Sequence, residues 1–279
     1  MAWLSNFLKS RSDKGEMPFI EHLEELRWRI IKAFLAIFAA GIIYFLNKSF
    51  IFDTLILGPV KPNFPTYKLF CWVGNVFHQS NMCIHKVNFT FYYLELAAPF
   101  LTHVKMAFVL GLITVFPYII FQLWQFIKPA LHDKERETIG GVVLSASLLF
   151  YLGVGFGYFL MAPLSINFLG SYQVSSAVRN QFNFNSYTSL LITMVLAAGL
   201  VFELPLIIFF IAKMGLITSQ FMTHYRRHAV IAVLVLATII TPSPDVFSLF
   251  IVALPIYILY EVSIIMVKRG EKRDKLKKA

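Results

Sequence analysis

The stretch Leu190–Ala212, LLITMVLAAGLVFELPLIIFFIA, decides the fold of this chain. It has 23 residues and contains one charged side chain. A helix that crosses a membrane needs about 20 apolar residues, because it rises about 1.5 Å per residue through a hydrocarbon core of about 30 Å. The stretch therefore predicts a membrane-spanning helix.

Glu203 is the charged residue of this stretch, and Pro205 follows it two positions later. A carboxylate inside a bilayer costs roughly 2.5–3.5 kcal/mol on insertion scales, so such groups are usually functional. Proline removes a backbone donor and weakens the helix beside it. We prefer a working carboxyl group that faces a partner or a polar cavity. The alternative is a neutral, structural Glu that is hydrogen-bonded to a neighbouring helix.

The composition as a whole is that of a membrane protein. Apolar residues make up 58% of the chain and charged residues 14%, against roughly 45–50% and 25% in soluble domains. No removable secretory signal is expected, because the first apolar run begins near Ile30. Glu21, Glu24 and Glu25 stand before it, where a signal peptide has basic residues.

The net charge of +10 reflects membrane orientation rather than nucleic-acid binding. Of the 25 Lys and Arg residues, 19 lie in the N-terminal stretch, in the loops near 128–136 and 213–227, and in the tail 268–279. The positive-inside rule then places both termini in the cytoplasm. We expect the basic tail to lie at the lipid surface.

We expect an all-α integral membrane protein with six transmembrane helices in a single domain that spans residues 1–279. Helices five and six are predicted to be short, because only 15 uncharged residues, Val246–Tyr260, precede Glu261. The first and second halves show no repeat, which argues against inverted-repeat transporters. The predicted helices cover about 19–46, 97–127, 138–163, 187–213, 228–241 and 246–267.

A long external loop is predicted over residues 47–96, and both cysteines lie in it. Cys71 and Cys83 are expected to form a disulfide in an oxidising compartment. Zinc binding together with His78 and His85 is the weaker alternative, because the spacing fits no usual pattern. The aromatic residues of the loop suit a cap that lies on the membrane.

Acidic side chains gather in two cytoplasmic segments. Glu21, Glu24 and Glu25 open the first helix, and three more acids lie in the loop 126–137. Arg29 and Lys32 are placed to neutralise part of the first cluster through i,i+4 pairs. Together the clusters predict a pocket for a cationic ligand. Paired arginines suit it best, because a guanidinium makes bidentate bonds with a carboxylate.

Enzyme motifs are missing from the sequence. It has no Gly-x-Ser-x-Gly, no His-Glu-x-x-His and no phosphate-binding Gly-x-x-x-x-Gly-Lys. We therefore expect no enzyme, no cofactor and no metal. A secondary transporter or channel that uses Glu203 as a proton or substrate site stays open as an alternative function.

Several ordered motifs resemble those of the TatC family, the receptor subunit of the twin-arginine protein translocase. They extend over nearly the whole chain. They are His22-Leu-Glu-Glu-Leu-Arg27, Gln122-Leu-Trp-Gln-Phe-Ile-Lys-Pro-Ala-Leu131, Glu135-Arg136, Phe202-Glu-Leu-Pro205, Arg226-Arg227, Thr241-Pro-Ser-Pro-Asp-Val-Phe-Ser248, Pro255 and Tyr260-Glu261.

This resemblance implies a glove-shaped bundle in a bacterial cytoplasmic membrane that exports folded proteins, driven by the proton gradient. The implied partners are twin-arginine signal peptides, TatA- and TatB-like single-helix subunits, other copies of the chain and lipid. The resemblance also implies residue roles: Glu25, Arg27, Phe126 and Glu135 for signal-peptide binding, Glu203 and Asp245 for partner contacts, and Pro59 for the structure of the first external loop. Leu249 departs from the family pattern, in which Gln is common at this position.

Overall fold

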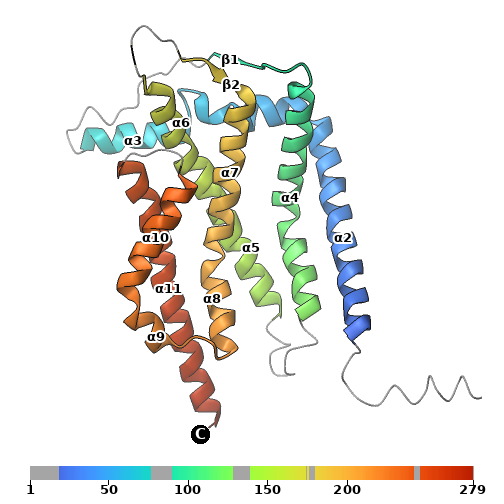
Figure 1. Cartoon of the computed structure of the whole chain (residues 1–279), viewed down its shortest axis with the longest axis vertical. Helices are drawn as coiled ribbons and strands as arrows, with labels where there is room; N and C mark the ends of the chain where they lie inside the picture. The colour runs from blue at the N-terminus through green and yellow to red at the C-terminus, as the bar shows by residue number, and fades with distance from the viewer. Residues whose placement is uncertain are drawn as a thin grey trace, which may run out of the picture.

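The computed structural model describes residues 19–76, 90–127, 139–173, 175, 180–241 and 246–278. These residues are almost entirely helical (Figure 1). In chain order the elements are α2 (Phe19–Leu46), η1 (Phe50–Ile56), η2 (Gly58–Val60), α3 (Pro65–Val76), β1 (Phe91–Tyr92), α4 (Ala98–Ile127), α5 (Ile139–Phe156), η6 (Gly157–Met161), α6 (Ala162–Ser171), β2 (Phe182–Asn183), α7 (Phe184–Phe202), α8 (Leu204–Lys213), α9 (Ser219–His224), α10 (Arg226–Ile240) and α11 (Val246–Lys278).

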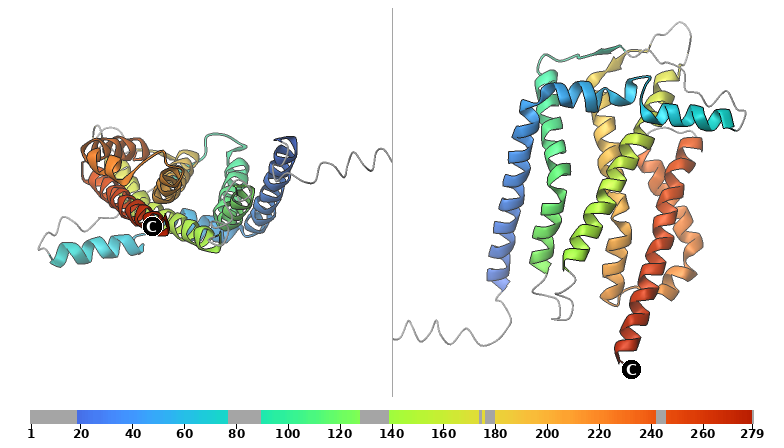
Figure 2. Two further views of the ribbon diagram at one scale, coloured as in Figure 1. Left: turned by 90° about the horizontal axis from the view of Figure 1, so that it is seen from below. Right: turned by 180° about the vertical axis from the view of Figure 1, so that it is seen from behind.

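Five helical segments among the described residues are long and apolar enough to cross a membrane. They cover 23–46, 98–126, 141–171, 184–213 and 248–272. Seen from below, they follow a curve, with α2 and α4 at one side and α10 and α11 at the other (Figure 2). We call the end of the bundle where α2 begins and α11 finishes the Glu25 end, and the end with β1 and β2 the sheet end.

The first two predicted spans match α2 and α4 to within one residue. The third is longer than predicted, because α5, η6 and α6 continue past Pro163 to Ser171. Proline at 163 removes the donor for the carbonyl of Phe159. The hydroxyl of Thr66 in α3 donates to that carbonyl instead, and the π-helical turn η6 joins α5 to α6.

The sixth helix also differs from the prediction. Helix α10 is short, with 15 residues, whereas α11 has 33 and runs into the basic tail. Glu261 lies inside α11, and Arg226 of α10 donates to its carboxylate at 2.8 Å. The segment predicted as a separate tail from residue 268 is helical as far as Lys278.

Two glycines let α5 and its continuation approach α7 closely. A Cβ atom on Gly153 would lie 2.6 Å from the carbonyl oxygen of Ala198, and one on Gly157 would lie 2.9 Å from that of Met194. Gly155 has nothing within 4 Å of such an atom. Close helix packing therefore depends on the missing side chains at 153 and 157 but not at 155.

The main buried core surrounds α7. Leu191, Met194 and Ala198 pack with residues of η6, α10 and α11, among them Met161 and Val252. A second, smaller core of Met222, Ile264 and Val267 joins α9 to α11 near the Glu25 end. Helix α11 thus contributes residues to both cores, and α10 to the main one.

At the sheet end, three tyrosines hold the chain that follows α2. The hydroxyls of Tyr158, Tyr187 and Tyr67 donate to the carbonyls of Leu55, Ile56 and Pro59 at 2.8, 2.5 and 2.6 Å. Pro59 is fully buried there, and burial raises the pKa of Tyr67 to about 12. This segment lies in the loop predicted over residues 47–96, and η1 and η2 form short helices in it.

Two further features of the sheet end were not predicted. Phe91 and Tyr92 pair in parallel with Phe182 and Asn183 as β1 and β2. Helix α3 lies across the direction of the spans and projects from the bundle (Figures 1 and 2). It contains Cys71, which is disulfide-bonded, whereas Cys83 lies outside the described residues.

Candidate functional site

The Glu25 carboxylate is the centre of the predicted site, and it is held by an arginine of its own helix. Arg29, one turn further along α2, donates from Nε to Oε1 of Glu25 at 3.1 Å and also from Nη2. This is the i,i+4 pair that the spacing predicts. The acid is therefore not a free surface charge, as an open acidic pocket would require.

Helix α4 holds the same arginine from the other side. Nη1 of Arg29 donates to Oε1 of Gln125 at 2.5 Å and lies 3.4 Å from Oε1 of Gln122. Gln122 is buried. The guanidinium thus joins the start of α2 to the end of α4, and we call Glu25, Arg29, Gln122 and Gln125 the arginine clamp. The glutamines were not singled out by the sequence analysis.

The second carboxylate oxygen of Glu25 accepts no hydrogen bond in the described part of the chain. This atom, Oε2, is buried, although the side chain as a whole is 28% exposed. Buried acceptors are nearly always satisfied, and an unsatisfied one costs on the order of 1–3 kcal/mol. The clamp therefore contains one carboxylate oxygen that is buried and lacks a hydrogen-bond donor among the described residues.

The other residues predicted for signal-peptide binding are only partly described. Arg27 is exposed on α2, two positions from both Glu25 and Arg29. Phe126 is half-buried at the end of α4, beside Gln125. Glu135 lies outside the described residues, so the predicted pairing of Glu25 with Glu135 remains a prediction.

Glu203 lies where the fourth span is interrupted. Helix α7 ends at Phe202 and α8 begins at Leu204, with Pro205 buried in its first turn. The break predicted from Pro205 is therefore confirmed. The carbonyl of Glu203 accepts from Leu206 N and Ile207 N, both at 3.0 Å, which restores the ladder after the proline.

The Glu203 side chain is buried, with 6% of its surface exposed. Its Oε1 has no hydrogen-bond partner among the described residues. This does not favour the alternative of a structural Glu bonded to a neighbouring helix. Asp245, the other residue predicted to contact a partner, lies outside the described residues.

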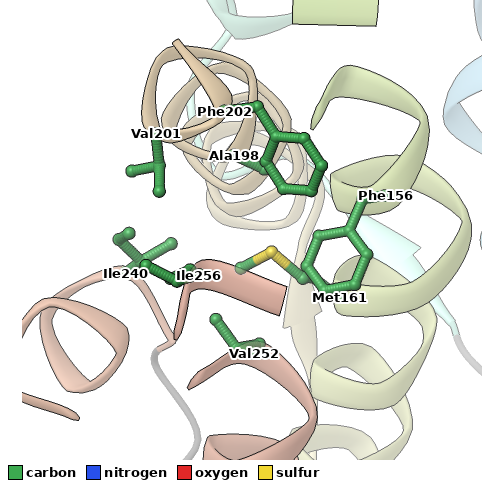
Figure 3. A pocket seen from close by; sticks show the side chains of 8 residues that line it. All are labelled: Phe156, Met161, Ala198, Val201, Phe202, Ile240, Val252 and Ile256. Atoms are coloured by element: carbon green, nitrogen blue, oxygen red, sulfur yellow. The ribbon is translucent and has the colours of Figure 1, made fainter. Parts of the chain in front are cut away.

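A small apolar cavity lies beside this break (Figure 3). Its wall includes Phe202, the neighbour of Glu203 in the sequence, and all of its lining side chains are apolar. It therefore offers the Glu203 carboxyl group no polar partner. The lining residues are Phe156, Met161, Ala198, Val201, Phe202, Ile240, Val252 and Ile256.

Two further polar links near the Glu25 end were not predicted. Glu271 of α11 accepts from Ser219 N at 2.8 Å and from Ser219 Oγ at 2.5 Å, at the start of α9. Arg226 pairs with Glu261 between α10 and α11. The paired residues are 35 and 52 positions apart and lie on different helices, so helical spacing gave no signal for them. The described residues contain no group of three or more side chains suited to a metal ion.

The fold and this site define an all-helical, multi-pass membrane protein with one polar clamp at its end and one buried acid in a span. The family model for the Sec-independent protein translocase protein (TatC) matches residues 21–255. A TatC from Blattabacterium sp. subsp. Periplaneta americana is 41% identical, over 91% of this chain and 96% of its own. The Escherichia coli (strain K12) TatC is 30% identical, with 94% of each chain covered.

Solved structures agree with the sequence comparisons. A crystal structure of the twin-arginine translocase receptor TatC in the detergent DDM superimposes with a TM-score of 0.67 and 28% identity. The match covers 88% of this chain and 99% of the other. A second crystal structure of the receptor gives a TM-score of 0.65.

The chain belongs to the TatC family. It is the receptor subunit of the Sec-independent, twin-arginine protein translocase, a transport component rather than an enzyme. The solute transporter or channel considered from Glu203 is therefore not its function. Neither the fold nor the family match assigns roles to its individual residues.

Proposed function

We propose that the arginine clamp is the place where this receptor binds the paired arginines of a signal peptide. The observation that carries the proposal is the buried, unpartnered Oε2 of Glu25 beside a resident guanidinium. A guanidinium from a ligand donates to that oxygen in the same way that Arg29 donates to the other. Glu135 supplies the second carboxylate, while Arg27 and Phe126 border the site.

In this proposal the Glu25 end faces the cytoplasm of a bacterium and the sheet end faces outward. The distribution of basic residues supports this orientation, since the segments that carry most of them start or end at the Glu25 end. Signal peptides are made in the cytoplasm, so the clamp lies on the side from which they arrive. Cys71 and its loop then lie in an oxidising compartment, which suits a disulfide.

Glu203 and Asp245 serve the other partners in this proposal. TatA- and TatB-like single helices, further copies of this chain and surrounding lipid complete the translocase. A buried carboxyl group without a hydrogen-bond partner at Oε1 binds a polar group of a neighbouring helix well, because no water competes for it in the bilayer.

Photocrosslinking of a signal peptide tests the binding site. A peptide with a photoreactive residue beside its paired arginines is added to membranes that contain the full chain. We expect Glu25→Ala and Glu135→Ala, alone and together, to reduce crosslinking strongly while the protein elutes normally in gel filtration. Glu261→Gln, which removes a carboxylate of the same end, is the matched control. Undiminished crosslinking in the double variant would overturn the assignment.

A further inference from the structure

Arg29 donates to Oε1 of Glu25, which is one of the two oxygens that a bidentate ligand arginine would use. We propose that Arg29 is a specificity-determining residue of the receptor, a resident competitor that makes Glu25 selective for arginine over lysine. The inference rests on the proposed binding of signal peptides at the clamp. It goes beyond that proposal because it assigns the discrimination between two cations to a residue that carries the same charge as the ligand.

The competitor is fixed in place rather than solvated. Arg29 has 18% of its side-chain surface exposed. Its nitrogens reach oxygens of three residues, Glu25 on its own helix and Gln122 and Gln125 on α4. A surface arginine with one ion pair moves aside at little cost, because such pairs contribute only about 0–1 kcal/mol. The Arg29 guanidinium is held by acceptors on α2 and α4, so moving it aside costs more.

Gln122 and Gln125 make the replacement of Arg29 by a ligand at Glu25 selective for arginine. When a ligand takes Oε1 of Glu25, Arg29 keeps its bonds to the glutamine oxygens, so its charge is not left without acceptors. A ligand guanidinium makes two parallel N–H···O bonds, one to the Oε1 that Arg29 leaves and one to Oε2. A lysine ammonium is a compact, strongly hydrated point charge that does not reproduce this fork. Displacement of Arg29 is therefore compensated for arginine and not for lysine.

The resident charge also screens the acid from single cations. With Arg29 bound, Glu25 and Arg29 together carry no net charge. A lysine or a lone cation is then attracted only weakly, and directional bonds decide binding. Without Arg29, a buried carboxylate would attract any cation, and affinity for lysine would rise.

The test compares two fluorescent signal peptides, one with paired arginines and one with paired lysines, for binding to the full chain in nanodiscs. We expect Arg29→Gln to reduce the arginine-to-lysine affinity ratio by about tenfold, mainly through tighter binding of the lysine peptide. Arg29→Lys keeps a positive charge at this position but loses the planar guanidinium. Its arginine-to-lysine affinity ratio should therefore lie between those of the unaltered chain and Arg29→Gln. Gln125→Ala loosens the clamp and should lower the ratio in the same direction.

Arg226→Gln is the matched control, because it breaks another arginine–glutamate pair near the same end; its ratio should equal that of the unaltered chain. An unaltered chain without preference for the arginine peptide would overturn the proposed function itself. A normal preference that Arg29→Gln leaves unchanged, or an equal loss of affinity for both peptides, would overturn only the role of Arg29. If Arg29→Gln does not fold, unchanged ratios in Arg29→Lys and Gln125→Ala have the same meaning.

Discussion

Arg29 donates to one oxygen of Glu25, while the other oxygen of that carboxylate is buried without a partner. Only one of the two carboxylate oxygens of Glu25 therefore accepts hydrogen bonds from the described residues. Arg29 is fixed by the glutamines of α4, so the unused oxygen keeps a defined position. An acid in this state differs from a solvated surface charge, because a donor that reaches Oε2 removes a desolvation penalty in addition to forming a bond.

Glu203→Gln is expected to preserve more function than Glu203→Ala. Glutamine keeps a hydrogen-bonding group in the break between α7 and α8, whereas alanine removes it. Export of a folded reporter protein and copurification of the single-helix subunits measure the effect. Equal defects in both variants would show instead that the carboxyl group must ionise.

Gly153→Ala is expected to destabilise the bundle, because the new Cβ would lie 2.6 Å from the carbonyl oxygen of Ala198. Overpacking of this kind costs about 1–3 kcal/mol. Gly155→Ala is the matched control, since nothing lies within 4 Å of its Cβ. Thermal unfolding in detergent compares the two, and equal melting temperatures would contradict the close approach of α5 to α7.

The hydroxyl of Tyr67 donates to the carbonyl of Pro59 at 2.6 Å, so Tyr67→Phe should cost about 1 kcal/mol. Burial raises the pKa of this tyrosine to about 12. Because its pKa in the folded chain is the higher one, its contribution is complete below about pH 10 and is lost as the pH rises toward 12. The fall in melting temperature over this range should be shallower in Tyr67→Phe. Parallel curves for both proteins would contradict this.

Helix α3 carries an exposed apolar stripe of Leu69, Trp72 and Val76, at spacings that put them on one helical face. It lies across the spans at the sheet end (Figure 2). We expect this face to rest in the lipid interface. The fluorescence of Trp72 is obtained as the difference between the unaltered chain and Trp72→Phe. Brominated lipids should quench it, and most strongly when the bromine lies near the headgroups. Quenching by aqueous iodide alone would place the helix in water.

Much of the fold could be predicted because uncharged runs determine spans in a bilayer. Helices α2 and α4 agree closely for this reason, and Pro205 predicted the break at Glu203. The continuation past Pro163 could not be predicted, and the Thr66 hydroxyl that donates to the Phe159 carbonyl there comes from 93 residues earlier in the chain. Likewise, Arg226 lies 35 residues before the Glu261 with which it pairs.

The candidate site was predictable to the same extent. The i,i+4 spacing predicted the pair of Glu25 and Arg29, since both lie on one helix. The contribution of Gln122 and Gln125 depends on the register between α2 and α4, which no local pattern specifies. Glu135 and Asp245 lie outside the described residues, so their roles rest on the family resemblance.

A double-mutant cycle between the chain and its ligand tests the central claim most directly. The affinities of the full chain and of Glu25→Gln are measured for a signal peptide with paired arginines and for one with paired glutamines. Direct contact predicts a coupling free energy of about 1.5–3 kcal/mol, the range of a hydrogen bond to a charged group. Additivity within about 0.5 kcal/mol would show that the arginines bind elsewhere, and it would contradict the account.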